Sequence, residues 1–371
     1  MLTSSLGIRL FLMIGKVIPV LAPASLMTAI ERVEVRNDPL QSNGFQITFR
    51  VSKNLLGEYN LLSLMSPVSL SPYTRVIIGV TLGLTPTVLI DGVITHQQLQ
   101  PSPQPGQATL TISGTDLTAL LDKVELNLVF ACMPYSAIAA LTLAPYLAYG
   151  IVPKVVPSPV MPEDFTPQYD TDLAFLQELA SFCNYVFYLE PAAPLVNMAY
   201  FGPDLRVAPV LPALTMDMGA SDNLLSISFT QDGNAPVLYT TQETIPETSI
   251  SIPMALPALR IPPLALVPTL PNRRRILRGT GMLDPGQLFG ELQNAQRAGL
   301  DSVRANGEVD SLRYGSVIRA RRLIGVRGAG LAYDGMYWVE NVTHVIERDK
   351  YTQSFELVRE GLYPILPAVL T

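Results

Sequence analysis

The sequence predicts a mainly β protein with an α+β insertion, in which two β-barrel-like domains accompany a small helical domain. Short runs rich in β-branched and aromatic residues occur in the first third of the chain and again near its end, and several alternate apolar with polar residues. Turn-forming residues separate these runs, and two segments with a helical period lie between the β-rich parts. Short strands at near-regular spacing indicate barrels or sandwiches rather than alternating strands and helices.

The composition favours a protein whose surface is partly covered by partners. The chain has 371 residues, enough for two or three domains that fold without disulfides. Hydrophobic residues make up 48% and charged residues only 15%, which indicates covered surface and an obligate oligomer. The net charge of -6 is opposite to the basic surface that binds nucleic acid, so we expect no nucleic-acid partner.

The first β-barrel-like domain is expected over residues 1–133. Asn43-Gly44 and Asp91-Gly92 are typical of turns between paired strands, because these residues accept positive φ angles. We expect residues 203–234, with a strand at 224–230, to return to this domain and complete it. The strands predicted before that return span residues 9–14, 32–36, 45–51, 75–80, 88–99 and 108–114.

The α+β insertion is expected over residues 134–202, after a short helical turn at 116–122. An uncharged helix is predicted at 134–149 and a strand at 184–189. A second helix is predicted at 170–185, where one apolar face recurs at helical spacing through Leu173, Leu176, Leu179 and Cys183. Asp170 or Thr171 can cap this helix.

Residues 235–275 are predicted to form a proline-rich connection, because prolines recur every few residues and no amphipathic period survives. The second β-barrel-like domain is expected over residues 276–371. It should contain a helix at 284–304 and strands at 316–325, 336–344 and 351–360.

Two apolar stretches have the hydrophobicity of export or membrane segments. Residues 6–30 resemble a signal peptide, but charges and prolines interrupt the apolar run. Residues 126–153 carry no charge and are long enough to span a bilayer, although Pro134 and Pro145 divide them. We expect a buried helix here and assembly of the protein in the cytoplasm, with a membrane anchor as an alternative.

No catalytic, cofactor-binding or metal site is predicted. Histidine is the commonest acid or base at neutral pH, and the chain has two, His96 and His344, both expected at the surface near strand ends. Cys132 and Cys183 form no CxxC pair and lie in apolar contexts, where we expect buried thiols.

Carboxylates are the remaining candidates, because a glycosidase needs only two of them at a set separation. Nothing in the sequence brings the available ones together, and we expect them in solvated loops and at a helix N-terminus. They are Asp170, Asp172, Asp301, Glu308 and Asp310.

Arginines form two dense groups in this acidic chain. Alternation places Arg319 and Arg321 on one face of the strand predicted at 316–325. Each group is interpreted either as a charged patch that docks an acidic neighbour or lines a channel, or as a solvated edge that discourages aggregation. The groups are Arg273, Arg274, Arg275 and Arg278, and Arg319, Arg321 and Arg322.

The order of several short motifs over residues 9–362 resembles the late control D family of phage tail hubs, in particular the form found in contractile injection systems, and the hub part of type VI secretion spike proteins. No single motif is specific, but their order and spacing are. The stretches that carry the resemblance are residues 44–49 (GFQITF), 88–95 (VLIDGVIT), 110–117 (LTISGTDL), 146–153, 172–179 (DLAFLQEL) and 337–342 (YWVENV).

The resemblance implies a homotrimer in which each chain contributes two similar tube domains, so that three chains form a pseudo-sixfold ring. Such a ring would join a hexameric inner tail tube to a trimeric spike. The sequence departs from fused hubs because it stops at Thr371, so we expect a separate spike protein. Baseplate wedge proteins are further expected partners, and no cofactor is expected.

The leading hypothesis is therefore a non-enzymatic structural hub of a baseplate, and the alternative is a tail-associated cell-wall hydrolase. Two hairpins, at residues 88–114 and 336–360, are expected to dock the inner tube. Each combines a long strand that contains one of the two histidines with a following alternating strand, a similarity consistent with internal duplication.

Overall fold

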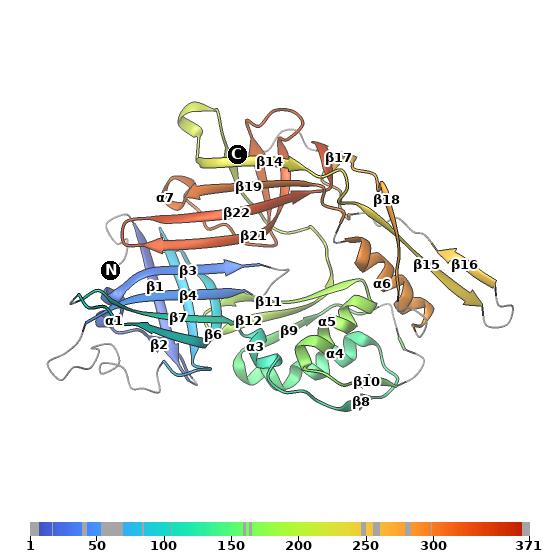
Figure 1. The fold of residues 1–371 in the computed structure, drawn as a ribbon, viewed down its shortest axis with the longest axis horizontal. Helices are drawn as coiled ribbons and strands as arrows, with labels where there is room; N and C mark the ends of the chain where they lie inside the picture. Colours follow the sequence, from blue (N-terminus) through green and yellow to red (C-terminus); the bar gives the residue numbers. More distant parts are fainter. Residues whose placement is uncertain are drawn as a thin grey trace.

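Strands dominate the computed structural model, and the helices lie mainly at one side of a large sheet (Figure 1). This confirms a mainly β fold with a helical insertion. The structure describes residues 7–16, 18–38, 43–52, 70–83, 85–104, 106–158, 161–162, 165–245, 250–254, 260–278, 283–297 and 299–365.

The first β unit contains the six strands expected from the sequence. They are β1 (Ile8–Gly15), β3 (Ile30–Asn37), β4 (Gly44–Val51), β5 (Arg75–Leu82), β6 (Thr85–Gln100) and β7 (Ala108–Asp116), with the short β2 (Val20–Leu21) and α1 (Ala24–Ala29) after β1. The stretch that resembled a signal peptide thus contributes β1, which pairs along its whole length with β5.

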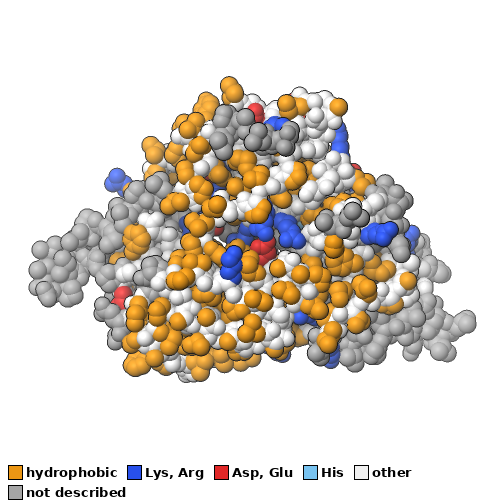
Figure 2. All heavy atoms as spheres, turned by 180° about the vertical axis from the view of Figure 1, so that it is seen from behind, with side chains coloured by type: hydrophobic (Ala, Val, Ile, Leu, Met, Phe, Trp, Pro, Cys, Tyr) orange, Lys and Arg blue, Asp and Glu red, His pale blue; other side chains and the backbone are white. Residues whose placement is uncertain are grey.

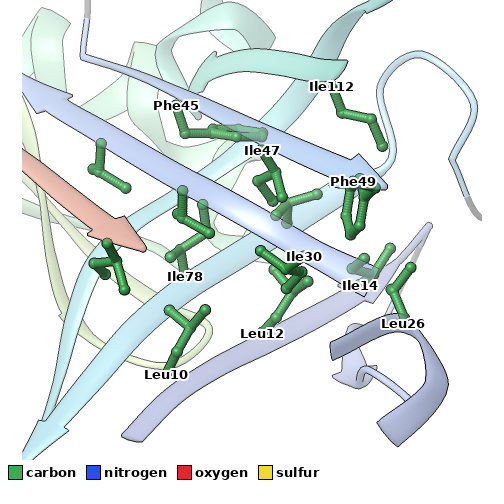
Figure 3. Packing of buried hydrophobic residues seen from close by; sticks show 14 of the residues in the cluster. Leu10, Leu12, Ile14, Leu26, Ile30, Phe45, Ile47, Phe49, Ile78 and Ile112 are labelled. Carbon is green, nitrogen blue, oxygen red and sulfur yellow. The ribbon is translucent and has the colours of Figure 1, made fainter. Parts of the chain in front are cut away.

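Alternation builds the core of this unit. In β4, Phe45, Ile47, Phe49 and Val51 are buried, while the residues between them face outward. Figure 3 shows Phe45, Ile47 and Phe49 among side chains of β1, β5 and β7, and α1 adds Leu26 at one end. Replacing Phe49 with alanine would lower the free energy of unfolding by about 3–5 kcal/mol, because removing the buried ring leaves a cavity.

The Asp91-Gly92 prediction was wrong, because this pair lies inside the long strand β6. Gly92 is needed there for close strand approach, since a Cβ would lie 2.1 Å from the carbonyl oxygen of Thr115. Asp91 serves a buried ion pair with Arg75, described below.

The α+β unit packs around its own core. Its elements are α3 (Thr118–Leu121), β8 (Leu128–Phe130), α4 (Tyr135–Leu143), the 3-10 helix η2 (Ala144–Tyr149), β9 (Ile151–Val155), β10 (Thr166–Gln168), α5 (Asp172–Phe182), β11 (Tyr185–Ala193) and β12 (Val196–Pro203). The Thr171 hydroxyl caps α5 by accepting from the Ala174 N–H at 3.3 Å, and Leu176 and Leu179 are fully buried beneath it.

The uncharged run at 126–153 folds into β8, α4, η2 and the start of β9. Pro134 precedes α4, and Gly150 ends η2 at a φ of 77°, which favours glycine. No helix in the described part of the chain is long and apolar enough to cross a membrane.

The segment expected to return to the first domain instead joins the second β unit. It forms β13 (Val210–Thr215), η3 (Gly219–Ser221) and β14 (Leu224–Gln231). β13 pairs with β20 (Leu323–Arg327), and β14 pairs with β19 (Val303–Asp310). Alternation identified β14 as a strand, but alternation carries no information about which strand it pairs with.

The proline-rich segment contains paired strands rather than only an extended connection. They are β15 (Val237–Ile245), β16 (Ile250–Met254), β17 (Ala265–Pro268) and β18 (Arg273–Ile276). β16 and β18 both pair with β15, and β17 pairs with β23 (Gly361–Pro364) near the end of the chain. Residues 246–249 and 255–259 of this segment lie outside the described residues.

The second β unit is completed by α6 (Pro285–Arg297), α7 (Ser311–Tyr314), β21 (Gly335–Glu347) and β22 (Tyr351–Arg359). The helix expected at 284–304 ends at Arg297, and β19 was not expected. β19 buries Val303, Ala305 and Val309 at strand spacing, but the small Ala305 and Gly307 give this alternating segment a low β-propensity. The strand expected at 316–325 begins only at Leu323, so Arg319 and Arg321 lie before it.

Candidate assembly surface

The two β units share one continuous sheet. β21 of the second unit pairs antiparallel with β3 of the first, and Thr343 lies opposite Arg36 at this junction. The strand order along the sheet is β14-β19-β22-β21-β3-β4-β7-β6-β5-β1-β2. Figure 1 shows β14, β19, β22, β21, β3 and β4 side by side.

The strand orders of the two units are the same. In the first unit they run β3-β4-β7-β6-β5, and in the second β14-β19-β22-β21-β20. Each unit also has a bulge in its fourth strand, between Ile94 and His96 in β6 and between Val339 and Asn341 in β21. The flanking strands differ, because β1 is antiparallel to β5 whereas β13 is parallel to β20.

One face of this sheet is polar across both units. Successive side chains of a strand point to opposite faces, so the residues between the buried ones share the outer face. One register row runs Glu347, Arg32, Thr48, Thr111 and Gln98 from β21 to β6. A second row runs Ser226, Glu308, Ser354, Thr343 and Arg36 from β14 to β3.

Arg32 forms two ion pairs on this face, one of which crosses the junction. Arg32 lies 2.9 Å from Glu34 on its own strand and 3.3 Å from Glu347 on β21. These side chains are exposed, so each pair contributes only about 0–1 kcal/mol. The charges on this face therefore contribute little to the free energy of unfolding, and their main effects are on solubility and on the local order of the side chains.

Among the described residues, β2 and β13 pair on one side only, and two further edges of the sheet belong to the strands that the two β units have in common. β14 pairs only with β19, and residues 95–100 of β6 pair only with β7. Both segments are largely exposed. Unpaired backbone N–H and C=O groups at such edges are templates for pairing with another chain.

The structure does not bring the two histidines together. His96 lies exposed on the polar face, 2.9 Å from the Thr95 hydroxyl. The surface prediction was wrong for His344, which is fully buried with its Nδ1 3.0 Å from the Tyr351 hydroxyl. Burial, with the nearby charge of Arg319, lowers the pKa of His344 to about 3.

The carboxylates considered for catalysis are dispersed among structural roles. Asp301, expected in a solvated loop, is buried between Arg206 and Arg260. Burial raises its pKa, but the two guanidinium groups outweigh burial and hold the pKa below its usual value. Asp310 caps α7 by accepting from the Leu312 N–H at 2.8 Å, and Glu308 lies on the polar face.

Asp172 lies at the start of α5, as expected, but is buried. It accepts from the Tyr146 hydroxyl at 2.7 Å and from Gln168 Nε2 at 2.8 Å. The described residues contain no group of His, Cys, Asp and Glu side chains that could hold a metal ion.

The two cysteines are not joined in a disulfide. Cys183 is buried as expected, and burial raises its pKa to about 12. Cys132 is exposed, which contradicts the expectation of two buried thiols. Its neighbours Phe130 and Met133 pack against the core of the α+β unit, so an apolar local sequence could not show that the Cys132 side chain itself is exposed.

The two arginine groups have different settings. Arg273, Arg274 and Arg275 lie exposed on β18. Arg322 pairs with Glu190 of the α+β unit, and Arg321 stacks 3.7 Å from the ring centroid of Tyr188. The second group thus lies between the units rather than on a strand face.

Large hydrophobic side chains are exposed in several places. Figure 2 shows hydrophobic side chains spread over the rear face, with basic and acidic side chains gathered near its centre. On the α+β unit, the exposed ones include Leu128, Val129, Phe165 and Tyr169 around the β8–β10 pair. Exposed apolar surface of this kind is typical of proteins that are covered by partners.

Solved structures share this fold, although no family model and no curated protein matches the sequence. A tail protein from Neisseria meningitidis MC58 aligns with 96% of this chain and 98% of its own, with a TM-score of 0.64 and 15% identity. The 43 kDa tail protein of prophage MuSo2 from Shewanella oneidensis aligns with 95% of this chain and 98% of its own, with a TM-score of 0.65 and 13% identity.

A component of the type VI secretion system of Escherichia coli, described as structurally similar to the T4 tail proteins gp27 and gp5, aligns with 91% of this chain and 77% of its own. Its TM-score is 0.55 and its identity 16%. The fold is therefore that of phage tail proteins and related secretion components.

Proposed function

We propose that this protein is the structural hub of the baseplate of a contractile, phage-tail-like injection particle. The observation that carries the proposal is the junction between β21 and β3, which joins two units of equal strand order into one sheet. The fourth strand of one unit pairs there with the first strand of the other. Repeating that junction between chains would continue the sheet from chain to chain, and we propose that it closes into a ring.

The open edges supply the strands for this repetition. By strand order, β6 is the counterpart of β21, and β14 is the counterpart of β3. β21 pairs with β3 through residues 342–347, beyond its bulge, and the free segment of β6 also lies beyond its bulge. We infer that residues 97–100 of one chain pair with β14 of the next chain.

The internal junction also fixes the register of this contact. Aligning the bulges makes Gln98 the counterpart of Thr343, because each lies two residues beyond the bulge. Following the cross-strand partners through the sheet makes Thr230 the counterpart of Arg36. Because Thr343 lies opposite Arg36, Gln98 is expected opposite Thr230 of the neighbouring chain.

Three chains would contribute six units to such a ring, which suits a homotrimer between a hexameric inner tube and a trimeric spike. The polar sheet face would line the lumen, where water remains in contact with it. The apolar patches of the outer surface would be covered by the separate spike and by baseplate wedge proteins. We propose assembly in the cytoplasm and a non-enzymatic role.

Disulfide trapping tests the ring. In a Cys132→Ser background, oxidation of Gln98→Cys with Thr230→Cys should give covalent species that end at a trimer, because directly opposite residues bring their Cβ atoms to about 4.5–5.5 Å. Each single variant carries one introduced cysteine, so its covalent species should not exceed a dimer. A monomer after oxidation, or a series extending past the trimer, would contradict the proposal.

The internal junction offers a matched control for this experiment. Thr343→Cys with Arg36→Cys has the equivalent geometry within one chain. Oxidation of this pair should form a disulfide within the chain, and the protein should remain a covalent monomer. If this control pair does not oxidise, disulfide formation at this geometry, rather than the ring, limits trapping. If it does oxidise, absence of a disulfide between Gln98→Cys and Thr230→Cys contradicts the ring.

A further inference from the structure

A cavity of about 240 Å³ lies where the three units meet. The ends of β3 and β7 and the first part of β6 form one wall, and α5 and β11 form another. The third wall comes from residues 319–321, before β20, and from His344 on β21. Since one water occupies about 30 Å³ of liquid, the cavity has room for a small solute.

Two guanidinium groups in this cavity have no carboxylate partner among the described residues. Arg319 donates to the Val88 carbonyl at 3.3 Å, and Arg321 stacks on Tyr188, but neither forms an ion pair. Burial lowers the pKa of both arginines. Glu190 opposes this lowering at both arginines and Asp204 at Arg321, but burial outweighs these carboxylates.

The carboxylates that line the cavity are already engaged. Asp38 pairs with Arg36 at 2.7 Å, and Glu190 pairs with Arg322. Asp116 accepts from Asn43 Nδ2 at 2.7 Å and from the backbone N–H of Thr118 at 3.0 Å. Among the described residues, these contacts leave Arg319 and Arg321 without a direct ion pair of their own.

His344 is a second, independent sign of a missing partner. Its side chain lines the cavity and is fully buried. Nδ1 lies near the Tyr351 hydroxyl, but Nε2 has no hydrogen-bond partner in the structure. Buried polar atoms are almost always satisfied, and a neutral imidazole that accepts at Nδ1 can donate from Nε2.

We propose that this cavity binds a small oxyanion, of the phosphate or carboxylate class. The planar guanidinium groups of Arg319 and Arg321 would hold the anion, because their N–H groups match two oxygens at once. His344 would donate a third hydrogen bond from Nε2. A bound anion would join the three units at their meeting point.

Calorimetric titration with inorganic phosphate and, separately, with succinate tests this site at constant ionic strength set by chloride. Wild-type protein should bind one equivalent of at least one of these anions, and the comparison identifies the class. Arg321→Gln should weaken binding about tenfold or more, because it removes charge-assisted hydrogen bonds. Arg313→Gln, at an exposed arginine outside the cavity, should bind like wild type.

Arg319→Lys provides a second variant that keeps the charge. It should bind the same anion more weakly than wild type, since an ammonium group cannot form the paired contact. Absence of saturable binding by wild-type protein would overturn the proposal, and so would equal weakening in Arg313→Gln and Arg321→Gln. Should Arg321→Gln fail to fold, the Arg319→Lys titration decides, and unchanged affinity there would overturn the proposal. The outcome is independent of the ring, because the cavity lies within one chain.

Discussion

At the residue scale, a buried ion pair of the first β unit forms hydrogen bonds to the α+β unit that local sequence patterns do not reveal. Arg75 on β5 contacts Asp91 on β6 through two bonds of 2.7 and 2.6 Å, and also donates to the Tyr149 carbonyl at 2.8 Å. Asn197 on β12 donates to Asp91 at 2.8 Å. This network therefore fastens the α+β unit to the first β unit.

Removing one partner of this buried pair should be costly. Asp91→Ala leaves the Arg75 charge buried without compensation, so the free energy of unfolding should fall by about 3–5 kcal/mol. Urea denaturation followed by circular dichroism measures the change. Glu34→Ala, which breaks an exposed pair with Arg32, should cost no more than about 1 kcal/mol. Equal losses in the two variants would contradict this assignment.

His344 should make the fold sensitive to acid. Its pKa is lowered from 6.5 to about 3 in the folded chain, so between these values the unfolded chain binds a proton that the folded chain does not. The free energy of unfolding should therefore fall as pH decreases from about 6.5, by up to about 1.4 kcal/mol per pH unit.

Urea denaturation at pH 7, 6 and 5 measures this loss. His344→Gln should lose less stability over this range than wild type, whatever its stability at pH 7. His96→Gln, at an exposed position, controls for the removal of an imidazole. Parallel pH profiles for His344→Gln and wild type would show that another group governs acid sensitivity.

At the element scale, the two hairpins singled out from the sequence form as expected. β6 pairs with β7 and β21 pairs with β22, and the register brings both tips to the same end of the joined sheet. The β21–β22 tip is exposed at Arg348, Asp349 and Lys350. In the proposed ring, both tips would lie on the same rim.

Charge reversal at this tip tests the tube-docking role that we propose for the hairpins. Arg348→Glu with Lys350→Glu should leave the hub trimer intact but block growth of the inner tube on it, because like charges at a docking edge oppose contact. Electron microscopy of reconstituted particles measures tube length. Arg273→Glu with Arg275→Glu on β18 reverses the same number of exposed charges away from this rim and should leave the tube unaffected. Tubes of normal length on the first variant would remove the hairpin from the tube interface.

At the scale of the whole molecule, the proposed ring makes oligomerisation sensitive to charges that are introduced at its open edges. Gln98→Lys with Thr230→Lys places like charges directly opposite each other between chains, which weakens strand pairing. Sedimentation velocity should show a shift from trimer towards monomer. Gln98→Lys with Thr230→Glu should restore the trimer, and equal behaviour of the two variants would argue against this register.

Local patterns in the sequence were sufficient for the type of most elements. Alternation of Phe45, Ile47, Phe49 and Val51 identified β4, and the leucine spacing with Thr171 identified α5, because each signal arises within one element. β19 was missed and α6 was extended too far, since the small Ala305 and Gly307 give the β19 segment a low β-propensity.

The sequence by itself determined a mainly β chain with a helical insertion, its main hairpins and its low charge. Only the tertiary structure decided that β14 joins the second unit, that the two units share one strand order, and that β21 pairs with β3. It also placed Asp301 and His344 in buried contacts and gathered Arg319 and Arg321 around a cavity. The physical reason is that propensity and periodicity act over a few neighbouring residues, whereas strand partners and burial depend on segments up to hundreds of residues apart.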